Sequence, residues 1–120
     1  MKRQYKRMTR PIESGYAYIR AHFREDVSIA ALAARAGYST AQFITLFHRA
    51  YGLTPKKYIT LLRLNRARLL LSVSDLSACD IAAHCGYEDT YHFYKLFRRR
   101  FGETPSAYRQ RIGQGGKRHV

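Results

Sequence analysis

The strongest constraint on the fold of this chain is an internal repeat. The pattern Ser-x3-Leu/Ile-Ala-Ala-x2-Gly-Tyr begins at Ser28 and returns 49 residues later at Ser77. After one inserted residue the offset becomes 50, and residues 43–58 match residues 93–108 at phenylalanine, leucine, glycine and Thr-Pro positions. So many coincidences at constant spacing are not chance. The chain therefore contains one supersecondary unit twice.

Each copy of the unit predicts two helices joined by a tight turn. Ser28 and Ser77 are good N-caps, and the apolar residues after them recur at helical spacing. Gly37 and Gly86 then end the first helix of each copy and suit a left-handed turn. The second helix carries an apolar stripe, which in the first copy starts at Phe43. A short helix, a glycine turn and an amphipathic helix together indicate a helix-turn-helix.

The rest of the chain also predicts helix, and alternating apolar and polar strands are absent. Thr54 and Thr104 are N-caps, and each is followed by proline at the first helical position. No glycine or proline occurs in residues 56–71, so a helix of about 17 residues and roughly 25 Å joins the copies. A strut of this length suits two recognition helices about one DNA turn, roughly 34 Å, apart. We therefore expect an all-α fold of two helix-turn-helix subdomains joined by a long linker helix.

The charge of the chain indicates a polyanionic partner. There are 22 Lys and Arg residues against 8 Asp and Glu, which gives a net charge of +14. Part of the excess lies in the flexible basic tails expected at residues 1–10 and 112–120, yet residues 11–111 alone hold 15 basic and 8 acidic residues. A folded body this positive repels itself, and a polyanion such as nucleic acid is the usual reason to tolerate the repulsion.

Several functional classes are excluded by what the sequence lacks. No apolar run approaches the ~18–20 residues that cross a bilayer, and no apolar segment follows the basic N-terminus as in a signal peptide. Cys79 and Cys85 are too few for a disulfide framework, and no metal-ligand, phosphate-loop or nucleophile pattern is present. We expect a cytoplasmic protein that is not an enzyme, needs no metal or cofactor, and is monomeric as a module.

A set of spaced residues in both copies carries a family resemblance. Its members are Leu32, Ala33, Gly37, Tyr38, Ser39, Phe43, Phe47, Gly52, Thr54, Pro55, Tyr58, Arg63, Leu64, Ala67, Leu70, Leu71, Ile81, Ala82, Gly86, Tyr87, Asp89, Phe93, Phe97, Phe101, Gly102, Thr104, Pro105, Tyr108 and Arg109. Over about residues 10–111 this set closely resembles the DNA-binding domain of AraC/XylS-type transcriptional regulators. The resemblance implies seven helices, of which the third and sixth enter successive major-groove segments on one face of duplex DNA.

The subdomains are expected at residues 11–53 and 73–111, with the linker helix at residues 54–72.

Three positions depart from the family pattern. Tyr91 stands where the family often has serine, Lys95 where it often has arginine, and Ala78 where isoleucine is common. The first two lie on the expected DNA face and therefore bear on the target sequence, whereas the third is a packing change.

The side chains opposite the apolar stripes are the candidates to read bases. In the first copy Gln42 suits adenine, and the methyl groups of Ala41 and Thr45 suit a thymine methyl, with Ile44 at the flank. In the second copy Lys95 suits guanine or phosphate. The remaining candidates there, suited to phosphates or bases, are Thr90, Tyr91 and His92. The alternative for both faces is a plain solvated surface.

Other polar and basic residues are candidates for phosphate contacts. Lys56 and Lys57 lie in the first turn of the linker helix, where backbone N–H groups also favour phosphate. The run from Arg98 onward should add affinity rather than specificity. The full set is Ser39, Thr40, His48, Lys56, Lys57, Arg98 and Arg99. Arg63, Arg66 and Arg68 are as well suited to covering apolar surface or pairing with acidic residues.

We therefore expect a sequence-specific transcriptional regulator that binds double-stranded DNA. The resemblance implies recruitment of RNA polymerase, and thus an activator. The alternative is a basic RNA-binding or nucleoid-type protein that binds nucleic acid without base specificity. Family members often carry a separate effector-binding or dimerisation domain, so the chain is either a stand-alone regulator or the C-terminal module of a longer one.

Overall fold

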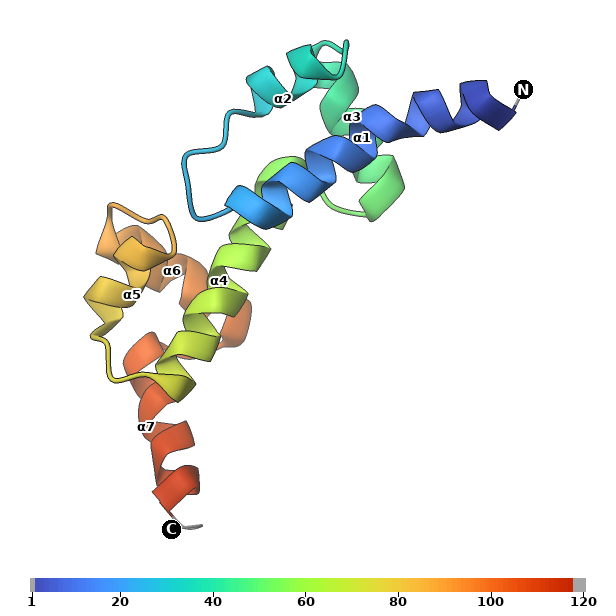
Figure 1. Ribbon diagram of the computed structural model, residues 1–120. Helices are drawn as coiled ribbons and strands as arrows, with labels where there is room; N and C mark the ends of the chain where they lie inside the picture. The colour runs from blue at the N-terminus through green and yellow to red at the C-terminus, as the bar shows by residue number, and fades with distance from the viewer. Residues whose placement is uncertain (1, 118–120) are drawn as a thin grey trace. The chain divides into compact units, whose positions relative to one another are not determined.

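The fold is built from helices. The computed structural model describes the backbone of residues 2–117 and the side chains of residues 12–113. This described part contains seven α-helices and no β-strand (Figure 1). The helices are α1 (Lys2–His22), α2 (Ile29–Arg35), α3 (Thr40–Tyr51), α4 (Pro55–Val73), α5 (Ala78–His84), α6 (Thr90–Phe101) and α7 (Pro105–Lys117). The predicted all-α class is confirmed.

The chain divides into two compact units, Met1–Leu62 and Arg63–Val120. Each unit has a hydrophobic core of its own, and α4 contributes to both. Tyr58 of α4 belongs to the first core, whereas Leu64 and Leu71 belong to the second. The duplication in the sequence therefore corresponds to two units that each bury their own helix pair.

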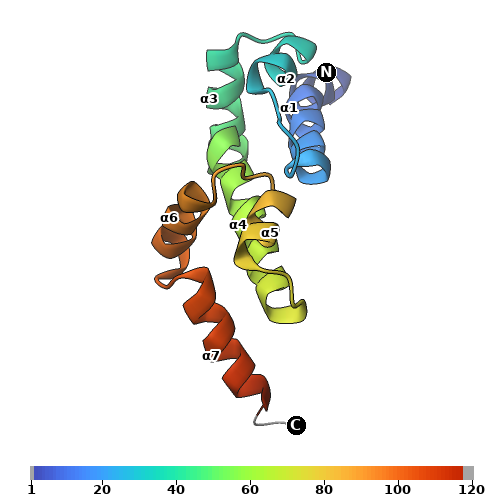
Figure 2. The same cartoon turned by 90° about the vertical axis from the view of Figure 1, so that its left-hand side faces the viewer.

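In the first unit α3 packs against α2 and α1, as Figure 2 shows. Phe43 and Phe47 of α3 are fully buried, together with Ile19 of α1 and, nearly so, Leu32 of α2. Gly15 allows α1 to come close to α3, because a Cβ atom added at Gly15 would lie only 2.7 Å from Cζ of Phe43. The buried face of α3 is thus fixed, and its opposite face is left to solvent.

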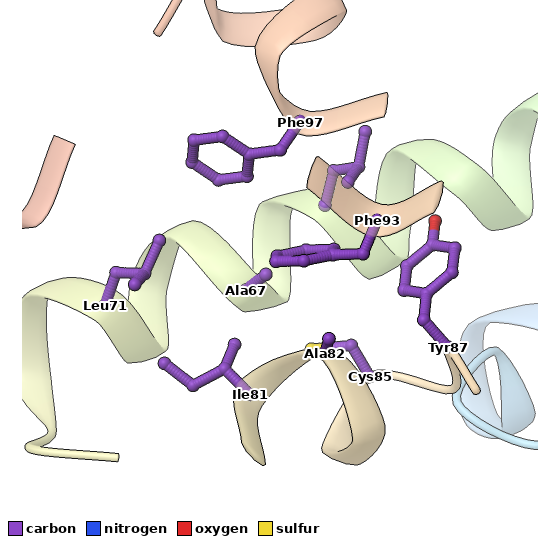
Figure 3. Packing of buried hydrophobic residues seen from close by; sticks show 9 residues of the cluster. Ala67, Leu71, Ile81, Ala82, Cys85, Tyr87, Phe93 and Phe97 are labelled. Carbon is purple, nitrogen blue, oxygen red and sulfur yellow. The ribbon is translucent and has the colours of Figure 1, made fainter. Parts of the chain in front are cut away.

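The second unit repeats this packing with α6 in the place of α3. Phe93 and Phe97 are fully buried, and Figure 3 shows their rings on the side of α6 that faces α4. Ala67 of α4, Ile81 of α5 and Cys85, which caps the end of α5, complete the contact. Two buried phenylalanines at equivalent positions thus anchor α6 in the second unit and α3 in the first.

The predicted helix ends are confirmed at the caps. The hydroxyl groups of Ser28 and Ser77 each accept a hydrogen bond from the backbone N–H of the residue three positions later, at 3.1 and 3.0 Å. Thr54 and Thr104 cap α4 and α7 in the same way. Gly37 and Gly86, at the two predicted turns, have positive φ. Gly52 and Gly102, which cap the C-terminal ends of α3 and α6, have positive φ as well.

The ends of the chain differ from the sequence prediction. Tails were expected at residues 1–10 and 112–120, whereas α1 begins at Lys2 and α7 continues to Lys117. Lys, Arg, Gln and Met have favourable helix propensity, which favours the first extension, but propensity does not explain why α1 continues through Pro11. Propensity does not explain the second, because α7 includes three glycines. Met1 and residues 118–120 lie outside the described residues.

Candidate nucleic-acid interface

α3 and α6 present equivalent surfaces to solvent. Across residues 41–50 and 91–100 the order of buried, half-buried and exposed side chains is identical at every position. The phenylalanines hold the buried positions in both helices, and the opposite faces are exposed. The chain therefore carries two copies of one exposed helical face, with different residues on each.

Most of the predicted base-reading residues lie on these exposed faces. The exposed members are Ala41, Gln42, Thr45, Tyr91, His92 and Lys95. Ile44 and Thr90 are half-buried instead. The hydroxyl oxygen of Thr90 lies 3.4 Å from Sγ of Cys79 on α5, so this side chain already has a partner within the protein.

Gln42 has a local role at the beginning of α3. The hydroxyl oxygen of Ser39 accepts a hydrogen bond from the backbone N–H of Gln42 at 3.1 Å, and Oε1 of Gln42 accepts one from the backbone N–H of Ser39 at 3.0 Å. This reciprocal pair is a capping box, and the Ser-x-x-Gln spacing could have revealed it in the sequence. A two-bond contact with adenine needs both the amide oxygen and the amide nitrogen. It would therefore compete with the cap.

A shallow hollow of about 360 Å³ lies on the exposed side of α3. Its lining residues are Tyr38, Ala41, Gln42, Thr45 and Leu46. Tyr38 and Leu46 were not among the predicted site residues, because both belong to apolar positions of the repeat. Ala41 and Thr45 thus lie in a concave surface rather than on a flat helix face.

On α6 the side chain of Asp89 fixes the beginning of the helix. One of its carboxylate oxygens accepts hydrogen bonds from the backbone N–H groups of Tyr91 and His92, at 2.9 and 3.3 Å. The ring of His92 meets the ring of Tyr87 edge-on, with centroids 6.0 Å apart. The first turn of α6 is therefore stabilised by the Asp89 cap and by the contact between His92 and Tyr87.

Tyr91 and Lys95 form a pair on the exposed face of α6. Tyr91 is 69% exposed, and Nζ of Lys95 lies 5.4 Å from the centre of its ring. At this distance an ammonium group is attracted by the ring face. The sequence named both residues as candidates but did not predict the contact between them.

The predicted phosphate candidates are all exposed. They are Ser39, Thr40, His48, Lys56, Lys57, Arg98 and Arg99. Arg98 and Arg99 lie in the last turn of α6, where a positive charge is also favourable to the helix dipole. Lys56 and Lys57 lie in the first turn of α4, where there is no acidic residue.

Arg63, Arg68 and Arg109 make contacts within the protein. The guanidinium of Arg63 lies over the ring of Tyr87 at 5.3 Å, and that of Arg68 lies over Phe101 at 4.6 Å. Arg109 donates hydrogen bonds to two backbone carbonyl oxygens at the end of α4, at 3.1 and 3.0 Å. For Arg63 and Arg68 the structure shows packing on aromatic rings, which is one of the roles that the sequence left open.

The tyrosines with shifted pKa values lie in the first unit, in an aromatic cluster outside the predicted site. Tyr16 stacks against Tyr51 and Tyr58, with centroids 4.1 and 5.0 Å away, and Arg20 donates to the hydroxyl groups of Tyr16 and Tyr58. Hydrogen bonds with Tyr58 and Arg20 lower the pKa of Tyr16, whereas burial raises the pKa of Tyr58. The cluster ties α1 to α3 and α4.

Two other kinds of site were sought in the described residues. Nowhere among them do three His, Cys, Asp or Glu side chains gather closely enough to hold a metal ion. None of the helices in this part of the chain combines the length and apolarity of a membrane span.

The chain is similar to known transcriptional regulators. A family model described as a helix-turn-helix domain matches residues 32–111. The HTH-type transcriptional activator RhaS of Escherichia coli O157:H7 (strain EC4115 / EHEC) is 40% identical over 94 residues, which are 78% of this chain and 34% of that protein. The chain thus spans about a third of the length of such curated relatives.

Solved structures agree with the sequence comparison. The DNA-binding domain of AdpA, a global transcriptional factor crystallised with a target DNA, has a TM-score of 0.78 at 32% identity, covering 83% of this chain and 90% of that one. An AraC-type regulator from Chromobacterium violaceum has a TM-score of 0.76 at 32% identity, covering 88% and 95%. From its two helix-turn-helix units and these similarities, we conclude that the chain belongs to the AraC/XylS family of transcriptional regulators, a family of DNA-binding proteins.

Proposed function

We propose that this protein is a transcriptional regulator that binds duplex DNA sequence-specifically by inserting α3 and α6 into successive major-groove segments. The observation that carries the proposal is the duplication of one exposed helical face, at residues 41–50 and 91–100, on a chain with a net charge of +14. An exposed helix at the end of a helix-turn-helix is the element that enters the groove in this motif.

The face of α3 favours contacts with thymine methyl groups. Ala41 and Thr45 line the hollow and offer methyl groups, and Ile44 flanks them. Apolar side chains discriminate thymine by its C5 methyl group in the major groove. Gln42 adds an amide nitrogen, while its amide oxygen stays with the cap.

The face of α6 favours hydrogen bonds. Lys95, Tyr91 and His92 are exposed donors there, and Thr90 adds a hydroxyl group at the helix start. Guanine offers two acceptors to such donors in the major groove. The phosphate contacts come from the exposed set Ser39, Thr40, His48, Lys56, Lys57, Arg98 and Arg99, which supplies affinity without base selectivity.

The wider role that we propose for the protein is based on its similarity to its relatives. RhaS is named as a transcriptional activator, and we propose activation here too, through recruitment of RNA polymerase by a protein surface of this chain. We place the protein in the cytoplasm, where its DNA target lies, and propose a monomeric module with subdomains at residues 11–53 and 73–111 joined by a linker at residues 54–72.

A competition experiment tests the proposal. A binding site would be selected from random duplex DNA, labelled, and bound by the protein in the presence of excess mixed-sequence DNA at moderate salt. Sequence-specific complexes survive this competition, whereas purely electrostatic complexes do not. Loss of the labelled complex to mixed DNA, or equally to duplex RNA, would instead indicate a non-specific nucleic-acid-binding protein.

A further inference from the structure

The contact between Tyr91 and Lys95 bears on how α6 selects a base. The two residues are one helical turn apart and so lie on the same face. The Lys95 ammonium lies 5.4 Å from the centre of the Tyr91 ring, and that ring is 69% exposed. The ring is therefore not a core side chain. Its contact within α6 is with a neighbouring cation on the proposed DNA face.

A free lysine is a poor reader of bases. Its ammonium is a compact charge on a flexible four-carbon stem, so it reaches a phosphate as readily as a base edge. An aromatic ring beside the ammonium restricts the orientations of the stem without neutralising the charge. The carboxylate of Asp89, at the cap of α6, is already engaged, because it accepts hydrogen bonds from two backbone N–H groups.

The equivalent face of α3 provides a natural comparison. At an offset of 50, Ala41 and Thr45 occupy the positions of Tyr91 and Lys95, with the same exposure. Neither of those side chains has a ring or a charge. The two helical faces thus share one geometry, but only α6 has an aromatic residue supporting a cation.

We propose that Tyr91 is a positioning residue, whose ring holds the Lys95 ammonium toward the major-groove edge of a guanine. The inference rests on the proposed function and deepens it. An ammonium group only donates hydrogen bonds, and guanine presents two acceptors, O6 and N7, on that edge. Adenine and cytosine each present an amino donor there, which the ammonium cannot use.

The test measures binding to a panel of single-base variants of the selected site. The proteins are the wild type, Tyr91→Phe, Tyr91→Leu and Lys95→Ala. Wild type and Tyr91→Phe should prefer guanine equally at one position, because both keep the ring. Tyr91→Leu should lose about two- to fivefold of that preference, the equivalent of an exposed cation–π contact of about 0.5–1 kcal/mol. Lys95→Ala should lose the preference at the same position.

A base analogue and a control variant complete the test. Replacing that guanine with 7-deazaguanine removes the N7 acceptor, and should weaken wild-type binding more than Lys95→Ala binding. Arg100→Ala removes another exposed cation of α6 and should leave the preference unchanged. Thermal melting of each variant should match the wild type, because the substituted side chains are exposed.

Three results would overturn the inference. If Tyr91→Leu keeps the full guanine preference, the ring does not position Lys95. If Tyr91→Phe loses as much of the preference as Tyr91→Leu, the hydroxyl group acts and not the ring. If Lys95→Ala weakens binding to all sites equally, Lys95 contacts a phosphate. A wild-type protein without any sequence preference would instead overturn the proposed function itself.

Discussion

Gly37 turns the chain between α2 and α3 with a φ of 80°, and Gly86 does the same between α5 and α6 with a φ of 102°. At Gly37 nothing lies within 4 Å of an added Cβ atom, so a substitution there is penalised by backbone conformation alone. We predict that Gly37→Val lowers the free energy of unfolding by more than ~1 kcal/mol, because β-branched residues disfavour positive φ. Gly37→Asn should lose less, since asparagine tolerates this region. Chemical denaturation of both variants measures the difference, and equal losses would contradict the backbone explanation.

The ionisation of Glu103 is expected to affect the stability of the fold, because its carboxylate pairs with Arg111. Arg111 donates to its carboxylate at 2.7 Å, and this hydrogen bond lowers the pKa of Glu103. A carboxyl group with a lowered folded-state pKa stabilises the fold above its unfolded pKa of about 4.3, and the stabilisation disappears as the pH falls through the folded pKa. Glu103→Gln should therefore be less stable than the wild type at neutral pH and equally stable in acid.

Unfolding curves measured from neutral to acidic pH test this expectation. Glu88→Gln is the control, because its substitution removes the same charge from an exposed position, whereas Glu103 is half-buried in its ion pair. A difference between Glu103→Gln and the wild type that stays constant down to low pH would show that the ion pair is not its cause.

At the scale of the helices, the approach of α1 to α3 depends on Gly15. An alanine there would place its Cβ 2.7 Å from Cζ of the fully buried Phe43. Alanine gains about 1 kcal/mol of helix propensity over glycine, but overpacking a core costs typically ~1–3 kcal/mol. We predict that Gly15→Ala lowers the free energy of unfolding. Gly113→Ala in α7, where nothing lies within 4 Å of the added Cβ, should be neutral or stabilising.

Phe43→Leu supplies the complementary measurement for the same contact. In combination with Gly15→Ala it should recover part of the loss caused by the alanine, because a smaller side chain relieves the clash. Simple additivity of the two losses in a double-mutant cycle would contradict a direct contact.

The helices themselves were predictable from the sequence, because their caps and turns use residues with specific backbone requirements. Ser28, Ser77, Gly37 and Gly86 have the conformations expected of them. The exposed faces were predictable as well, since the phenylalanines fix which side of each helix is buried. The contacts made by exposed polar side chains were not predicted. The contact of Lys95 with Tyr91 depends on rotamers that helical periodicity does not determine. The cap role of Gln42 was not predicted either, although the Ser-x-x-Gln spacing is a sequence signature of a capping box.

For the whole molecule, the excess of positive charge predicts salt-sensitive binding. Arg98 and Arg99 are exposed at the end of α6, and each phosphate contact contributes about one unit to the slope of log K against log salt. Arg98→Ala should therefore weaken binding to all sequences similarly and make the slope shallower by about one unit. Arg66→Ala, an exposed cation of α4 outside the proposed interface, should leave the slope unchanged. A change in base preference with an unchanged slope would assign Arg98 to base reading instead.

The claim that α3 and α6 each read bases is tested most directly by selecting binding sites from random duplex DNA with the wild type, Thr45→Ala and Lys95→Ala. The wild type should select two base-specific segments about one helical turn apart. Thr45→Ala should relax the selected bases in one segment only, and Lys95→Ala should relax them in the other segment only. Recovery of no common sequence, or relaxation of the same segment by both variants, would contradict the claim that α3 and α6 each read bases.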